Sequence, residues 1–134
     1  MPEALRPAKS EYAPFYQGYV ERVPEGDIRL ILRVQLDDTL TLLRPLTDEQ
    51  AAYRYAPGKW SVLQVVGHLI DAERIFVYRA TCVARGDRTP LPGFDENTYA
   101  EAGDFDQRAL HSLIGEWEAV RHSTAAFFQH LPDA

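Results

Sequence analysis

The sequence has little of several features that would narrow its function at once. It holds one cysteine, Cys82, in 134 residues, which excludes an internal disulfide and suits a reducing compartment. Lysine and arginine total 14 against 20 acidic residues, and the resulting net charge of −6 argues against nucleic acid as a partner. No apolar run approaches the length of a membrane span or resembles a secretory signal. We therefore expect a cytoplasmic protein that binds neither nucleic acid nor membrane.

The alternation of apolar and polar residues that marks strands is also missing from the chain. Apolar residues recur instead at helical spacing in three long segments. The composition, with 46% hydrophobic and 25% charged residues, is that of an ordinary globular domain. We predict one all-α domain over residues 1–134, since this length supports a single core and is too short for two.

Two of the long helices have clear boundaries. Asp27 is a good N-cap, and the apolar stripe after it ends before Pro45, which disfavours helical backbone in the preceding residue. The next helix begins after Ser61, which has the pattern of a capping box, and it ends at Gly86. It is therefore predicted over residues 62–85, a length of about 35 Å.

The other segments are less regular. The first 26 residues, with several prolines and tyrosines, are expected to form an arm with one short helix that adheres to the body through its rings. Residues 86–103 are predicted to form a long irregular connection, a kind of loop that is often functional. A third long helix is expected to begin near Asp104 or Asp106 and to end at Pro132.

His68 interrupts the apolar part of the second long helix. At about 100° per residue it shares a face with Ala72, Ile75 and Arg79, which we interpret as the inward face, and Asp71 borders that face. The simpler interpretation is a partly buried core histidine that is hydrogen-bonded to a neighbour. The alternative is a metal ligand oriented by Asp71, since bundles build metal sites from side chains on facing helices.

The remaining histidines do not complete a site with His68. On the third helix, His111, Glu118 and His122 share a face about 140° from the apolar stripe, so we expect them to face solvent. Glu118 and His122 are expected to form an exposed pair four residues apart. His130 is expected near the helix end as a favourable cation. The residues alone therefore provide one inward ligand candidate and no partners for it.

The stretch YRYAPGKWSVLQVVGHLIDAERIFVYRATCVARGD, followed by PLPGFDENTY, closely resembles the DinB-like superfamily of metal-dependent proteins, also called YfiT-like. The tripeptide at 59–61 and the segment 67–71 are its most specific parts, and the resemblance covers nearly the whole chain. It implies an up-and-down four-helix bundle, frequently a homodimer, with a divalent metal held by three histidines. His68 matches the ligand that the second helix provides.

The resemblance also implies a function. It points to a metal-dependent enzyme, such as a thiol-dependent S-transferase or a related hydrolase or isomerase, that acts on a small-molecule substrate. Zinc or nickel is the expected metal, and a low-molecular-weight thiol is an expected cosubstrate. Asp71 is expected to support the ligand, and Phe94 and Tyr99 to wall the substrate pocket. Three charged residues of the same helix are expected to form ion pairs between helices instead: Glu73, Arg74 and Arg79.

The family's other two ligands come from a His-x-x-x-His pattern on a C-terminal fourth helix, which is absent from this sequence. Three explanations stay open: a longer protein, a member that lost its metal site, or a partner chain that supplies the helix. Three helices alone would expose apolar stripes, so a longer chain or a homodimer is favoured over a monomer. The rival function is a non-catalytic dimeric helical module, a scaffold or stress-response protein in which His68 is structural.

Overall fold

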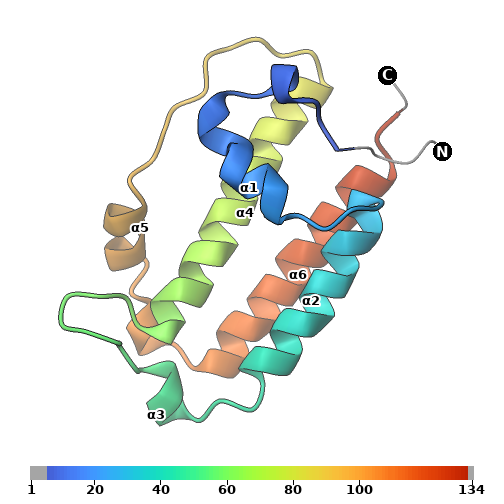
Figure 1. Ribbon diagram of the computed structural model, residues 1–134. Coiled ribbons are helices and arrows are strands. Elements are labelled where there is room, and N and C mark those ends of the chain that lie inside the picture. The colour runs from blue at the N-terminus through green and yellow to red at the C-terminus, as the bar shows by residue number, and fades with distance from the viewer. Residues whose placement is uncertain (1–5, 133–134) are drawn as a thin grey trace.

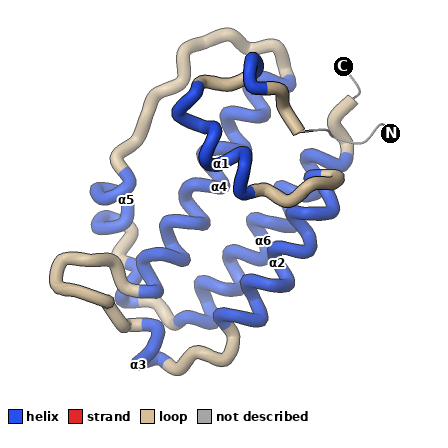
Figure 2. The backbone as a smooth tube through the Cα atoms, viewed as in Figure 1, coloured by secondary structure: helices blue, strands red, loops and turns tan. Residues whose placement is uncertain are grey.

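The computed structural model describes residues 6–132, and three long helices form its body. These are α2 (Ile28–Leu43), α4 (Val62–Ala84) and α6 (Leu110–Gln129). α6 lies between the other two, and both pack along it (Figure 1). The described residues contain no strand (Figure 2), so the predicted all-α bundle fold is confirmed. Within them, no helix combines the length and the apolar character that crossing a bilayer requires.

Short helices and turns occupy the segment before α2 and the connections between the long helices. Three are α-helical: α1 (Gln17–Arg22), α3 (Asp48–Ala51) and α5 (Glu96–Ala102). The described residues also contain three 3-10 turns: Lys9–Glu11, Pro14–Tyr16 and Phe105–Gln107.

The capping residues account for the starts of α2 and α4. The side chain of Asp27 accepts a hydrogen bond from the Arg29 amide at 2.9 Å, and hydrogen bonds from the Arg29 side chain lower the pKa of Asp27 to about 2. Ser61 and Gln64 form the predicted reciprocal capping box. Gly86 follows the end of α4 with a φ of 72°, the left-handed backbone that glycine adopts without strain. The predicted boundaries of both helices are confirmed to within one residue.

The connection after α4 differs from its prediction because it contains a helix. Asp95 accepts a hydrogen bond from the Thr98 amide at 2.8 Å and caps α5, which was predicted to be irregular chain. The signal was present in the sequence as an aspartate at the N-cap position followed by a glutamate.

The predicted start of the third long helix is wrong by several residues, since α6 begins only at Leu110. Asp104 adopts left-handed backbone with a φ of 52°, and Asp106 lies in a 3-10 turn. Neither aspartate caps α6, because the side chain of Asp106 binds Ser61 and Arg54 instead.

The arm does not adhere to the body in the predicted way. The rings of Phe15, Tyr16 and Tyr19 are 74%, 49% and 65% exposed, and they contact one another at centroid distances of 5.1–6.4 Å. Arg6 instead closes the arm on itself, since its side chain binds the carbonyl of Val20 and the carboxylate of Glu25. Residues 1–5 of the predicted arm lie outside the described residues.

The core forms where α2 and α4 meet the apolar stripe of α6. Most of the predicted stripe on α6 is buried, including Leu113, Ile114 and Trp117. The buried core residues of the other two long helices are Leu36, Leu40 and Leu43 of α2 and Leu63, Val66 and Ile70 of α4. Burial of these side chains provides most of the favourable free energy of folding.

A buried arginine links the three long helices. Arg121 of α6 is 6% exposed, and it pairs with Glu73 of α4 at 2.7 Å. The same guanidinium donates to the carbonyl of Leu32 at 2.9 Å and to the side chain of Gln35 at 3.1 Å, both in α2. Thr124 adds a hydrogen bond of 3.1 Å to Glu73. The charge is thus fully partnered, as burial of an arginine requires.

We predict that Arg121→Ala lowers the free energy of unfolding by about 3–5 kcal/mol, because it leaves the Glu73 carboxylate buried without its cation. The matched control is Arg74→Ala. Arg74 pairs with Glu116 at 2.7 Å, but its side chain is 54% exposed, so the expected loss is about 1 kcal/mol or less. Urea unfolding of both variants measures the difference, and equal losses would contradict the account.

Phe105 holds the short 3-10 turn against α4. A Cβ atom added to Gly67 of α4 would lie 2.3 Å from the Phe105 ring, and one added to Gly103 would lie 2.4 Å from it. The ring is buried, and it therefore fills the space that the two missing side chains leave. Gly67 directly precedes His68, so this contact also places the start of α4.

We predict that Gly67→Ala destabilises the protein by about 1–3 kcal/mol, since the added methyl group must displace the Phe105 ring. Gly115→Ala is the matched control within α6, where a Cβ would meet nothing within 4 Å. That variant should gain about 0.5–1 kcal/mol from the better helix propensity of alanine. Thermal or urea unfolding should show changes in the free energy of unfolding of opposite sign for the two variants. A stabilised Gly67→Ala variant would exclude the proposed packing.

Candidate functional site

A polar cluster around the buried hydroxyl of Ser61 holds the start of α4, the helix that carries His68. The hydroxyl of Ser61 donates to Asp106, and Arg54 pairs with the same carboxylate. Arg54 also donates to the carbonyl of Lys59 at 2.7 Å and to the side chain of Gln64 at 2.6 Å. The cluster ties the connection before α4 to the turn before α6. The sequence showed the capping box but not this long-range use of Asp106.

His68 lies on a different face of α4 from the one we predicted. The residues that enter the core beside α6 are Val66 and Ile70, each about 160° around the helix from His68 at 100° per residue. His68 is half-buried, and its ring contacts the ring of Trp60 at a centroid distance of 4.9 Å. The assignment of His68 to the inward face is therefore wrong. α4 has apolar residues on more than one face, so the pattern did not reveal which face meets α6.

Asp71 lies one turn after His68 and is also half-buried. Burial raises the pKa of the Asp71 carboxyl, and the charge of Glu116 raises it further, while Arg74 and His68 act in the opposite direction. The carboxylate is thus close enough to His68 to interact with it electrostatically.

The predicted wall of the pocket lies against α4. Phe94 and Tyr99 contact each other at 5.1 Å between centroids, and α5 packs on α4 (Figure 1). Arg79 fastens this segment, since it donates to the Pro92 carbonyl at 2.9 Å and lies 6.0 Å from the centre of the Phe94 ring. The prediction of an ion pair for Arg79 is therefore replaced by contacts with a loop. Glu73 and Arg74 do form the expected pairs between helices.

The other histidines lie apart from His68, as the sequence predicted. His111 and His122 are exposed on α6. Glu118 pairs at 3.0 Å with Arg44, the residue that follows α2, and so it is not held by the predicted pair with His122. Within residues 6–132, no group of three or more His, Cys, Asp or Glu side chains is arranged to hold a metal ion.

A wide apolar groove runs between α2 and α4. Its volume is about 790 Å³, and Leu42 and Leu43 of α2 face Val65 and Leu69 of α4 across it. Trp60 lines the same groove and links it to His68, whose ring it contacts. Tyr53 and Tyr55, which the sequence did not indicate as candidates, also line it. Of the apolar residues, Leu42, Val65 and Leu69 remain exposed to solvent.

Comparison with known sequences assigns this arrangement to a family. The sequence model of the DinB superfamily matches residues 31–134, most of the chain. The chain belongs to the DinB superfamily. A relative from Geobacillus thermodenitrificans (strain NG80-2), which carries the name "Putative metal-dependent hydrolase", is 32% identical over 94 residues. The match covers 64% of this chain and 53% of the relative, so this DinB-family chain spans about half the length of that protein. No solved structure was found to match this chain.

We predict that Asp71→Asn becomes more stable relative to the unmodified protein as the pH rises. The folded-state pKa of Asp71 lies above its ordinary value of 3.8. The protonated carboxyl therefore contributes stability that is complete below pH 3.8 and is lost as the pH rises through the folded-state pKa. The amide does not titrate, so the variant escapes this loss, and urea unfolding at pH 4 and pH 7 measures the difference.

Asp95→Asn provides a control of opposite sign. The hydrogen bond from the Thr98 amide lowers the pKa of Asp95, so its carboxylate contributes stability that is present above the ordinary pKa and lost as the pH falls. The free energy of unfolding of the Asp95→Asn variant should therefore fall relative to that of the unmodified protein as the pH rises from 4 to 7. If both variants shifted in the same direction, the assigned burial of Asp71 would be wrong.

Proposed function

We propose that this DinB-family protein is a metal-dependent enzyme of the hydrolase or thiol S-transferase type, in which His68 donates one imidazole nitrogen to a divalent metal. The observation that carries the proposal is the position of His68. The imidazole is half-buried beside Trp60 and Asp71, and the resemblance matches it to the ligand on the family's second helix. The family match and the name of the relative from Geobacillus support metal dependence.

The described residues fit only part of such a metal site. A catalytic zinc is typically held by three protein ligands with one open position. Near His68 the structure places one carboxylate, Asp71, and residues 6–132 contain no group of three suitable donors. These residues therefore do not complete a site for zinc or nickel, and we derive no reaction step through the metal. The proposal requires further ligands from outside the described residues.

Each neighbour of His68 has a proposed role that does not depend on the identity of the metal. The indole of Trp60 contacts the imidazole at an interplanar angle of 49°, and its role is to restrict the rotation of that ring. Asp71 stabilises the orientation in which a ring nitrogen points away from the helix. Phe94 and Tyr99, fastened through Arg79, form an apolar wall for a small-molecule substrate and an accompanying low-molecular-weight thiol. The half-buried position of His68 reduces competition from water for its nitrogen.

The test is the metal content of the full-length protein, purified without an affinity tag. We predict close to one divalent metal ion per site, with zinc or nickel most abundant, and a loss of most of it in His68→Ala. His122→Ala is the matched control, because it removes an exposed imidazole from α6 and should retain the metal. Elemental analysis by mass spectrometry after extensive dialysis measures all three proteins.

Two outcomes would remove this proposal. One is the absence of stoichiometric metal in the unmodified protein, and the other is an unchanged metal content in His68→Ala. Circular dichroism of the His68→Ala variant must accompany the measurement, so that loss of metal is not confused with loss of fold.

A second candidate function is a non-catalytic dimeric helical module. The apolar groove between α2 and α4 favours it, because exposed apolar patches of this kind are common at protein interfaces. In that case His68 and Trp60 form a structural contact. Metal-free protein that sediments as a dimer would support this function over the enzyme.

A further inference from the structure

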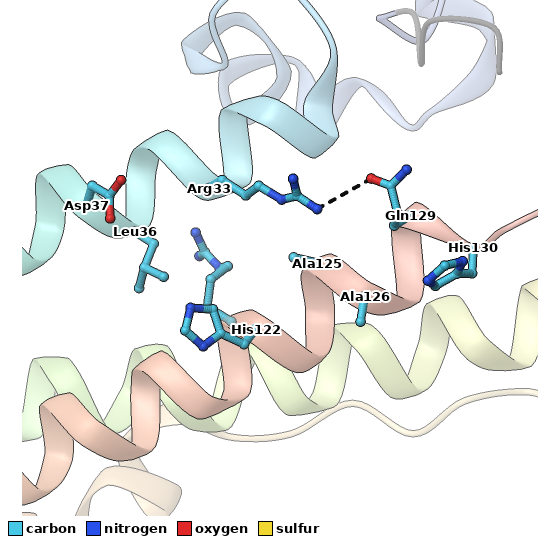
Figure 3. Close-up of a pocket in the computed structure, with 9 residues that line it drawn as sticks. Arg33, Leu36, Asp37, His122, Ala125, Ala126, Gln129 and His130 are labelled. Carbon is cyan, nitrogen blue, oxygen red and sulfur yellow. Dashed lines mark hydrogen bonds between the residues drawn. The ribbon is translucent and has the colours of Figure 1, made fainter.

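A second groove lies between α2 and the C-terminal half of α6, and Figure 3 shows its lining. Its volume is about 510 Å³, within the range of small-molecule sites. It shares no lining residue with the apolar groove between α2 and α4. Asp37 and Leu42, which line one groove each, lie about 140° apart around α2. A helix or partner chain that covered the apolar groove would leave this one accessible.

The groove is richer in nitrogen-bearing side chains than in carboxylates, although the chain as a whole is acidic. The protein has a net charge of −6, yet the groove is lined by two arginines and two histidines against one carboxylate, that of Asp37. The charge of Arg121 is already matched by Glu73 at the buried floor. The rim is therefore formed by the guanidinium of Arg33 and the imidazoles of His122 and His130, which offer N–H donors.

Arg33 is the donor that the fold leaves available. Its guanidinium extends along the groove to Gln129, whose side-chain oxygen lies 3.5 Å away (Figure 3). That distance is longer than the 2.7–3.2 Å of an ordinary N–H···O bond, so the contact holds the arginine only weakly. No carboxylate in the described part of the chain pairs with Arg33. A guanidinium has five N–H donors in a planar fork that matches an oxyanion.

The floor of the groove is apolar. Leu36 and Ala125 are buried beneath the rim, and Ala126 is exposed beside them (Figure 3). An inorganic ion would use only the rim, whereas an organic anion would also cover these side chains. Asp37 closes one end of the groove and would repel a second negative group there.

We propose that the groove between α2 and α6 binds a small organic oxyanion, a phosphate monoester or a carboxylate with a compact apolar body. Arg33 donates to the oxyanion, His122 and His130 line the two ends of the groove, and the apolar body rests on Leu36, Ala125 and Ala126. This site is separate from His68 and does not rest on the proposed metal-dependent function.

A simpler interpretation is that Arg33 and His130 only complement the negative end of the α6 dipole. That interpretation accounts for the charges at the C-terminal end of the helix. It predicts no saturable binding and no preference for an organic anion over an inorganic one. Binding measurements therefore distinguish the two interpretations.

The experiment is a titration of the whole chain with four probes, monitored through the NMR signals of the histidine imidazoles. The probes are phenyl phosphate, benzoate, inorganic phosphate and phenol. We expect phenyl phosphate or benzoate to shift the signals of His122 and His130 saturably and to bind more tightly than inorganic phosphate. Phenol should produce no saturable shift, and comparison of the two organic anions identifies the preferred head group.

Two variants and their controls test the assigned contacts. Arg33→Gln should weaken binding about tenfold or more, the loss expected for a charge-assisted hydrogen bond, while Arg88→Gln, an exposed loop change of equal charge, should leave it almost unchanged. Ala126→Glu places a carboxylate in the groove and should abolish binding. Ala119→Glu makes the same change at an exposed position of α6 outside the groove and should retain it.

Three results would overturn the proposal. They are the absence of any saturable shift, unchanged affinity in Arg33→Gln, and binding of phenol or inorganic phosphate as tight as that of the organic anions. Arg33 and Ala126 are exposed, so the variants should fold, and the circular dichroism spectrum of each verifies this.

Discussion

The buried guanidinium of Arg121 is the interaction on which the arrangement of the long helices depends. It joins α6 to α4 through Glu73 and to α2 through the carbonyl of Leu32 and the side chain of Gln35. α2 and α4 pack along α6, with a wide groove between them. The relative rotation of α2 and α4 is therefore set through α6. Because the ion pair is desolvated, it tolerates little rotation of α4 about its axis.

This constraint decides which way His68 points. With Glu73, Val66 and Ile70 directed to α6, the imidazole faces Trp60 rather than the shared core. The candidate site is thus built at the side of the helix rather than in the shared core. A third face of α4, with Val65 and Leu69, opens on the apolar groove. The three faces of this helix therefore differ: one packs in the core, one carries His68 and one exposes an apolar surface.

Local signals in the sequence predicted much of the fold. Asp27, Ser61 and Gly86 mark helix ends correctly, because capping depends on residues within one turn of the boundary. The start of α6 was mispredicted because Asp106 binds Ser61, a residue 45 positions away in the chain. Contacts of that kind leave no periodic pattern. The prediction that the rings of the arm pack on the body was wrong for a related reason, since an aromatic residue does not reveal which surface it contacts.

The candidate site was predictable in part. The resemblance and the odd placement of an imidazole in an apolar helix both identified His68, and Asp71 followed from its spacing. The contact with Trp60 was not foreseen, because it depends on how the chain before α4 turns back over the helix. The face of His68 was also misassigned, since α4 carries apolar residues at Val65 and Leu69 as well as at Val66 and Ile70.

The central claim is that His68 binds a metal ion. The most direct measurement is a crystal structure of the full-length protein grown with zinc, with anomalous diffraction recorded on both sides of the zinc absorption edge. The account predicts an anomalous peak about 2.0–2.1 Å from a ring nitrogen of His68. A zinc ion bound elsewhere, with both nitrogens of His68 engaged only by protein groups, would contradict it.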